Sequence, residues 1–276
     1  MEGSIDTYRR DKVDLGLKGK VALVTGAGEG IGRATILTFA EEGANVVVND
    51  IVASKAESVA DEAAALGAEA VAVLADVSNA DEVDGLIKQV ISKFGRIDIL
   101  VNNAYASDRK LFTQSARADW EKPINVCLYG ALNCSRAVIG HMVERKYGKI
   151  ISIISDAGRI GEPGLPAYSA AKAGILAFSR SLAKEVGRHN INVNCVSPGA
   201  TNTERRIREH QLEWERASEE ERERIKRRDE KQLRLYPLGR LGQPEDVANV
   251  IVFLATERAR QITGEVISVN GGYAMV

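Results

Sequence analysis

The chain has 276 residues, of which 45% are apolar, and its formal net charge at pH 7 is −1. This length and composition suit a globular α/β protein with a sizeable core, and the balanced charge argues against a nucleic-acid partner. The three cysteines form no CxxC pair and the three histidines are scattered, so no metal site is expected.

Residues 1–17 are polar and charged, and we expect them to form an N-terminal extension. They contain no apolar segment typical of a signal peptide. No apolar run elsewhere in the chain approaches the length of a membrane span, so no membrane partner is expected. The odd number of thiols fits a reducing compartment. Together these features predict a cytoplasmic protein.

Short apolar runs alternate with longer segments of helical spacing. The predicted strands are residues 20–25, 45–50, 69–74, 97–102, 149–154, 191–196 and 265–269, and the clearest predicted helices are 31–42, 54–66 and 80–94. Most of the runs are almost wholly apolar, as strands covered on both faces must be. We therefore predict a single α/β domain, 1–276, with a Rossmann-like doubly wound parallel sheet of about seven strands and helices on both faces.

A glycine-rich segment follows the first predicted strand. TGAGEGIG at 25–32 has the spacing GxxxGxG through Gly26, Gly30 and Gly32, and Glu29 and Ile31 lie within it. Glycines allow a tight turn and a close approach of the backbone to a pyrophosphate, at which the N–H groups of the following helix point. The segment therefore predicts a dinucleotide site.

Asp50 ends the second predicted strand, where a carboxylate ordinarily binds the adenosine ribose hydroxyls. Its charge, together with that of Glu29, would repel a 2′-phosphate. No basic residue occurs in the glycine-rich segment or at Asp50 and Ile51 to hold that phosphate. The sequence therefore favours NAD(H) over NADP(H).

The segment AYSAAKAG at 167–174 places the phenol of Tyr168 and the amine of Lys172 four residues apart, on one face of a helix. A free tyrosine has a pKa of about 10, too high for a good base at neutral pH, and a neighbouring ammonium favours the phenolate. We interpret Tyr168 as an acid/base and Lys172 as the group that lowers its pKa. Ser155, after the fifth predicted strand, is expected to face the same crevice.

Residues 204–235 break the alternation, because they are dense in charges of both signs. Most of these charges are expected on solvated helical faces with i,i+4 pairs. The apolar residues among them, including Trp214, need a surface to pack on. We therefore expect a charged helical lid over the substrate cleft.

These motifs, with NNA at 102–104 and PG at 198–199, resemble those of the short-chain dehydrogenase/reductase family in order and spacing, from about Lys18 to Gly272. The resemblance is strongest to NAD-linked members that act on secondary alcohols and ketones, including 3-oxoacyl reductases and hydroxysteroid dehydrogenases. It implies the catalytic residues Asn125, Ser155, Tyr168 and Lys172. Ser155 would bind the substrate oxygen, and Asn125 would hold a water that links Lys172 to solvent.

The resemblance also implies cofactor contacts, and Tyr168 and Lys172 lie beside the nicotinamide end. The further implied contacts are Asp76 and Val77 at the adenine, Asn103 and Ala104 at the riboses, Pro198 and Gly199 at the nicotinamide, and Thr201 and Thr203 at its carboxamide and the neighbouring phosphate. The family generally pairs its outer helices, so a homotetramer is expected.

The family usually has a glycine after NNA, where this chain has Tyr105. We expect Tyr105 to line the substrate pocket together with Arg159 and Trp214. Arginines there would suit a hydroxyacyl-CoA, whereas an alicyclic hydroxy compound would not need them. Two alternatives stay open: an NADPH-linked 3-oxoacyl-carrier reductase, and a catalytically idle NAD-binding scaffold or redox sensor, because fold alone does not determine function.

Overall fold

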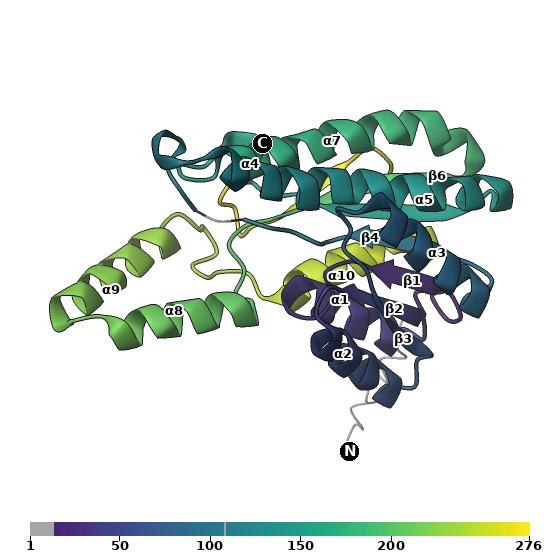
Figure 1. The fold of residues 1–276 in the computed structure, drawn as a ribbon, viewed down its shortest axis with the longest axis horizontal. Helices are drawn as coiled ribbons and strands as arrows, with labels where there is room; N and C mark the ends of the chain where they lie inside the picture. Colours follow the sequence, from purple (N-terminus) through teal and green to yellow (C-terminus); the bar gives the residue numbers. More distant parts are fainter. Residues whose placement is uncertain (1–13, 108) are drawn as a thin grey trace, which may run out of the picture.

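A seven-stranded parallel sheet forms the centre of the molecule (Figure 1). The computed structural model describes residues 14–107 and 109–276. The strands pair in the order β3-β2-β1-β4-β5-β6-β7, and every pair is parallel. Their bounds are β1 (Val21–Val24), β2 (Asn45–Asp50), β3 (Ala70–Leu74), β4 (Ile99–Asn102), β5 (Gly148–Ile153), β6 (Ile191–Pro198) and β7 (Val266–Val269). The predicted doubly wound sheet is confirmed. Its strand order reverses between β1 and β4, where such sheets bind ligands.

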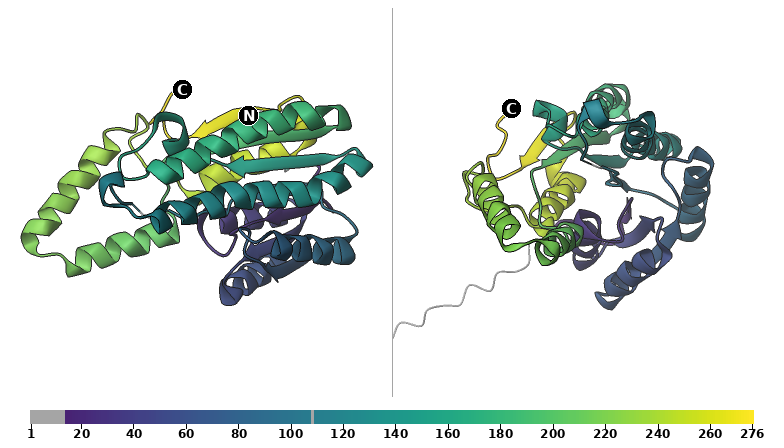
Figure 2. Two further views of the ribbon diagram at one scale, coloured as in Figure 1. Left: turned by 45° about the horizontal axis from the view of Figure 1, so that its top comes forward. Right: turned by 60° about the vertical axis from the view of Figure 1, so that its left-hand side comes forward.

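Helices cover both faces of the sheet (Figures 1 and 2). The longer ones are α1 (Gly30–Glu41), α2 (Ala53–Ala65), α3 (Ala80–Phe94), α5 (Gly130–Arg145), α7 (Pro166–Val186) and α10 (Pro244–Ala255). On one face, α1, α2 and α10 pack against alternate strand residues such as Val24 and Val46. On the other face, α3, α5 and α7 pack against the intervening residues, such as Leu23 and Val47. Burial on both faces explains why the strands are almost wholly apolar.

Shorter helical turns occur in the connections. They are η1 (Phe112–Gln114), α4 (Arg117–Pro123), the π-helical turn η2 (Ile124–Tyr129), α6 (Ala157–Ile160), η3 (Gly187–His189) and η4 (Glu257–Ala259). Among the long helices, α3 shows clear local start and stop signals. The Asn79 side chain accepts hydrogen bonds from the backbone N–H groups of Asp81 and Glu82, and Gly95 ends the helix at a φ of 70°.

Leu17, the fourth described residue, already belongs to the core. Leu17 is 1% exposed and packs with the cluster formed by α1, α2 and α10. The polar extension expected over 1–17 therefore does not include Leu17. Residues 1–13 lie outside the described part of the chain.

A buried carboxylate ties the elements together at the amino end of the sheet. Asp98, just before β4, is 0% exposed and accepts hydrogen bonds from Val21 N at 3.0 Å, from Arg96 at 2.6 Å and from Arg145 at 2.8 Å. Burial acts to raise the pKa of Asp98, but these donors outweigh it, so the pKa lies below its ordinary value. The network joins β1, β4 and α5 far from the carboxyl edge of the strands.

Residues 204–233 form two helices, α8 (Glu204–Arg216) and α9 (Glu219–Leu233), which we call the arm. The arm projects beyond the carboxyl edge of the sheet (Figures 1 and 2). Its two helices are held together by His210 and Asp229, whose side chains are 2.7 Å apart, and by Arg228 and Glu213 at 2.6 Å. The predicted helical character of this charged segment is confirmed.

None of the helices in the described residues is both long enough and apolar enough to cross a lipid bilayer.

Candidate active site

Tyr168, Lys172 and Ser155 come together at the carboxyl edge of the sheet. Tyr168 and Lys172 lie in the first two turns of α7, and Ser155 follows β5. The Lys172 ammonium is 2% exposed, donates a 2.6 Å hydrogen bond to the Ile153 carbonyl, and lies 5.7 Å from the centroid of the Tyr168 ring. A charged amine held in this way inside the protein and beside a phenol is typical of a catalytic site rather than of a packing contact.

The electrostatics of Tyr168 differ from the prediction. Burial raises the pKa of Tyr168 well above its ordinary value, and a hydrogen bond with Ser155 acts in the opposite direction without reversing the shift. Burial likewise lowers the pKa of Lys172. The expected lowering of the Tyr168 pKa is therefore wrong for the groups of this chain, because desolvation of the phenolate is the largest effect and outweighs the hydrogen bond with Ser155. At neutral pH, Tyr168 is a protonated donor.

Asn125 is exposed, unlike the other three predicted catalytic residues. It lies in η2 and is exposed, whereas Cys127, two residues further on, is 2% exposed and packs with Ile154 and Tyr168. Cys127 is also close enough to influence the pKa values of both Tyr168 and Lys172. The resemblance alone implied Asn125. Residues two apart in a helix do not share a face, so the burial of Cys127 leaves Asn125 on the exposed side. Cys127 is the residue that sequence reasoning missed.

The Cys127 thiol also connects η2 to the loop after β4. The Ala106 N–H donates to the sulfur, and the thiol donates to the Ala106 carbonyl, both at 3.5 Å. This loop carries Asn103, Ala104 and Tyr105. Cys127 thus links this loop to the cluster in which Tyr168 packs.

The glycine-rich loop is held close to the loop after β4. Gly26 has a φ of 58°, and a Cβ placed on it would lie 2.8 Å from the Ala104 Cα. The Asn103 amide donates to the carbonyls of Thr25 at 2.8 Å and Gly26 at 2.9 Å. Asn103 and Ala104 thus support the glycine-rich loop.

The predicted cofactor residues lie in loops that border the carboxyl edge of the sheet. Asp50 accepts a 2.9 Å hydrogen bond from the Gly28 N–H, and Thr203 lies against Gly30, where an added Cβ would be 3.1 Å from its methyl group. The remaining predicted contacts lie in the same loops: Glu29 to Gly32 at the start of α1, Ile51 after β2, Asp76 and Val77 after β3, and Pro198, Gly199 and Thr201 at and after the end of β6. The N–H groups at the start of α1 lie beside a space that only glycine leaves open, and they suit a pyrophosphate. The carboxylate at the end of β2 suits a ribose, so the arrangement fits a dinucleotide.

Two basic residues missed by sequence reasoning approach this border. Lys55, on α2, lies 2.7 Å from Glu29, and Arg208, on α8, lies 3.3 Å from the same carboxylate. Burial acts to raise the pKa of Glu29, but hydrogen bonds from Lys55 and Arg208 hold it below its ordinary value. Both residues come from other helices, so they lie outside the two segments, the glycine-rich one and Asp50 with Ile51, in which the sequence shows no basic residue.

The predicted substrate residues separate into two groups. Tyr105 is 47% exposed, and the Arg205 guanidinium lies 5.8 Å from the centroid of its ring. Trp214, in contrast, packs within the arm, where Arg222 and Lys226 lie 5.6 and 5.8 Å from the centroid of its ring. Arg159 donates to Ser268 of β7 at 2.5 Å. Tyr105 therefore stays a candidate, and Arg159 is held in a structural contact. Trp214 also lines a cavity formed mainly by α8 and α9, so its role as a substrate contact stays a prediction.

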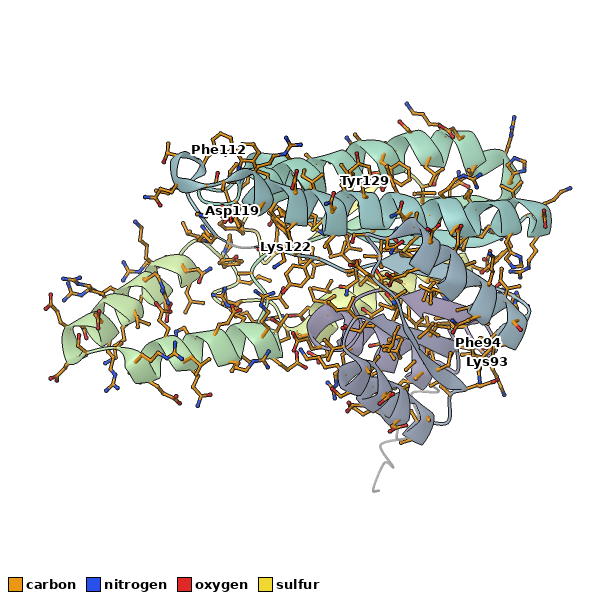
Figure 3. The ribbon with its side chains drawn as sticks, in the orientation of Figure 1. Lys93, Phe94, Phe112, Asp119, Lys122 and Tyr129 are labelled. Atoms are coloured by element: carbon orange, nitrogen blue, oxygen red, sulfur yellow. The ribbon has the colours of Figure 1, made fainter. Side chains whose placement is uncertain are left out.

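An aromatic pair lies beside Tyr168. Figure 3 shows Phe112 in the segment between β4 and α5, on the same side of the molecule as the arm. Its ring stacks on Trp120 with the centroids 5.1 Å apart, and Trp120 lines a small cavity together with Pro166 and Tyr168. Both aromatic side chains are partly exposed, so they offer an apolar surface at the mouth of the site. In the described ranges, 14–107 and 109–276, no group of three metal-ligating side chains occurs.

Comparison with known proteins gives similarities over nearly the whole chain. A family model described as enoyl-(acyl carrier protein) reductase matches residues 26–274. The (2S)-[(R)-hydroxy(phenyl)methyl]succinyl-CoA dehydrogenase subunit BbsD of Thauera aromatica is 42% identical over 95% of this chain and 99% of its own length. The 3-oxoacyl-[acyl-carrier-protein] reductase of Synechocystis is 44% identical over 94% and 98%, and FabG of Thermotoga maritima is 38% identical over 93% and 98%.

Proposed function

Because the chain belongs to the short-chain dehydrogenase/reductase family, we propose that it is an NAD(H)-linked oxidoreductase that interconverts the hydroxyl and keto groups of an acyl thioester, such as a hydroxyacyl-CoA. The observation that carries this proposal is the buried Lys172 ammonium beside Tyr168 and Ser155, at the same edge of the sheet as the glycine-rich loop.

Different residues of the chain have different roles in the proposed reaction. When bound, NAD(H) supplies or accepts the hydride. Tyr168 is protonated at neutral pH and donates its proton to the carbonyl oxygen during reduction. The Ser155 hydroxyl binds the same oxygen and stabilises the charge that develops there. Asp50 would hold the adenosine ribose and the N–H groups of the glycine-rich loop the pyrophosphate. One N–H of Lys172 is held by Ile153, and the other two remain for the nicotinamide ribose.

The substrate class is supported by two observations. The relatives are named for an acyl-CoA and for 3-oxoacyl groups on acyl carrier protein, so both kinds of named substrate are thioesters. In this chain, Arg205 lies over Tyr105 at the predicted substrate cleft. Its Nε is bound by Glu209 at 2.7 Å, and its terminal N–H groups would be the ones to face an anionic carrier. An uncharged alicyclic ketone would gain nothing from Arg205.

The cofactor preference has a second candidate. Asp50 and Glu29 support NAD(H) because they oppose a 2′-phosphate. Lys55 and Arg208 favour the alternative, an NADPH-linked 3-oxoacyl-carrier reductase, because they stand beside Glu29 and carry the charge that a 2′-phosphate needs. We favour NAD(H), since Lys55 and Arg208 are already paired with Glu29.

The test of cofactor preference compares kcat/KM for NADH and NADPH with one 3-oxoacyl thioester. We expect NADH to be preferred in the wild type and the preference to narrow in Glu29→Gln, which releases Lys55 and Arg208. Asp84→Asn, an exposed acid on α3, controls for the change in net charge. A wild-type preference for NADPH would establish the alternative.

The test of the activity uses the purified protein with NADH and a panel of 3-oxoacyl-CoA thioesters, the same acyl groups on an uncharged N-acetylcysteamine carrier, and alicyclic ketones. Turnover is expected with the thioesters. For the CoA series alone, KM should rise with ionic strength. Binding of NADH without turnover of any carbonyl compound would favour an idle scaffold or redox sensor instead.

We also propose that the protein assembles as a homotetramer. Partly exposed apolar side chains on the outer helices, including Tyr129 at the end of η2 and Phe253 on α10, support this. Light scattering after size-exclusion chromatography tests it, and a monomer at micromolar concentration would contradict it.

A further inference from the structure

The N-terminus of α1 is bound by a carboxylate from a distant part of the chain. Glu204, the first residue of α8, accepts a 2.8 Å hydrogen bond from the Gly30 N–H, which opens α1. The other oxygen of the same carboxylate lies 3.7 Å from Arg33 in the next turn of α1. The residue at the N-cap of α1, Glu29, makes no side-chain capping bond of its own. The start of the arm thus supplies the cap that α1 otherwise lacks.

The Gly30 N–H belongs to the group that the proposed cofactor would use. The first N–H groups of a helix have no partner inside the helix, and they favour an anion through both hydrogen bonding and the helix dipole. A carboxylate and a phosphate offer them the same chemistry: a negative charge and an oxygen acceptor. Glu204 therefore places a negative charge where the glycine-rich loop is suited to hold a pyrophosphate.

We propose that Glu204 is a determinant of cofactor affinity whose carboxylate competes with the pyrophosphate of the dinucleotide for Gly30, so that the start of the arm moves when the cofactor binds. The proposal rests on the proposed function only in requiring that the protein binds a dinucleotide. According to the proposal, the Glu204 carboxylate lowers the affinity for the dinucleotide, whereas a residue that supports the glycine-rich loop would raise it.

The structure allows the start of the arm to move. Helix α8 contains no buried residue, so polar contacts rather than a packed core hold it on the body. The contacts with the glycine-rich loop are those of Glu204 and the ion pair between Arg208 and Glu29 at 3.3 Å, while Thr203 packs against Gly30. Exposed contacts of this kind contribute little to stability.

Movement of Glu204 would also change the proposed substrate cleft. Arg205 is the next residue of α8, and its guanidinium lies over the ring of Tyr105. Displacing the carboxylate from Gly30 would therefore shift the cation that faces the proposed substrate cleft.

The experiment measures the affinity of Glu204→Gln for NADH by the fluorescence of the bound nucleotide. Glutamine keeps the size of the side chain and removes its charge, so we expect the Kd for NADH to fall about five- to tenfold, within the range of helix-terminus charge effects. Glu215→Gln, the same change near the far end of α8, is the matched control and should leave the Kd within about twofold of the wild type. Adenosine, which carries no phosphate, should bind equally well to all three proteins.

A second measurement follows the arm without using activity. Hydrogen exchange of residues 203–216 should become faster when NADH is added to the wild-type protein. In Glu204→Gln, the same residues should exchange faster before any nucleotide is added. Thermal unfolding of the variant checks that the sheet is intact.

The outcomes separate this proposal from the proposed function. If the wild type binds NADH and Glu204→Gln binds it equally or more weakly, Glu204 supports the loop rather than competing with the cofactor, and the inference is overturned while the proposed function stands. If the wild type binds neither NADH nor NADPH, the proposed function fails first. An adenosine affinity that changes as much as the NADH affinity would also contradict competition at the pyrophosphate.

Discussion

Replacing Tyr168 by phenylalanine separates the chemistry of the site from its packing. The aromatic ring packs against the buried cluster of Cys127, Ile154 and Ile175, and phenylalanine keeps that contact. Only the hydroxyl and its hydrogen bond with Ser155 are lost. A single neutral hydrogen bond contributes about 1 kcal/mol to stability, so the unfolding temperature should fall by only about 2–4 °C in a chain of this size.

The expected effect on turnover is far larger than the effect on stability. A positioned acid or base accelerates proton transfer about 10²- to 10⁴-fold, which corresponds to roughly 3–5 kcal/mol of activation free energy. The kcat of Tyr168→Phe should therefore fall by about three orders of magnitude, while the Kd for NADH stays within about threefold of the wild type. Steady-state NADH absorbance with a 3-oxoacyl thioester measures the first quantity, and NADH fluorescence measures the second.

The pH dependence gives an independent check. Since burial raises the Tyr168 pKa, the proton donor persists through neutral pH, and reduction should decline only as the pH rises through that elevated pKa. Oxidation needs the deprotonated form, so its rate should increase with pH over the same range. Both dependences should vanish in Tyr168→Phe. A variant that retains more than about a tenth of wild-type kcat, with an unchanged pH profile, would refute the assignment of Tyr168 as the acid/base.

Three further predictions test the surrounding structure. Asp98→Asn should lower the free energy of unfolding at pH 7, measured with urea, by about 2–3 kcal/mol, because it leaves two partly exposed arginines without their buried partner. Since the pKa of Asp98 in the folded state is depressed, the difference in unfolding free energy from the wild type should shrink below about pH 4. A difference that stays constant with pH would contradict this. Asn125→Ala should leave kcat/KM within about twofold, because Asn125 is exposed away from Tyr168, and a loss of tenfold or more would restore its predicted catalytic role. Gly32→Ala should weaken NADH binding at least about tenfold, since its Cβ would lie 2.5 Å from the Gly26 carbonyl oxygen, whereas Gly85→Ala on α3, which meets no atom within 4 Å, should bind NADH normally.

Much of the fold was predictable because its signals are local. Strands buried on both faces read as short apolar runs wherever they occur, and the glycine-rich turn between β1 and α1 is contiguous in the chain. The same holds for Tyr168 and Lys172, which share one face of α7 by their spacing alone. For these features, neighbours in the sequence are also neighbours in space.

The sequence by itself determined the parallel sheet, the glycine-rich loop and the pairing of Tyr168 with Lys172. Only the tertiary structure decided that Cys127 packs against Tyr168 while Asn125 is exposed, because which side of this turn is buried depends on the elements packed against it. It also decided the upward shift of the Tyr168 pKa and the meeting of Lys55 and Glu204 with the glycine-rich loop. Desolvation and charge pairing depend on which distant segments pack together. The residue pattern of a single segment does not predict those distant neighbours.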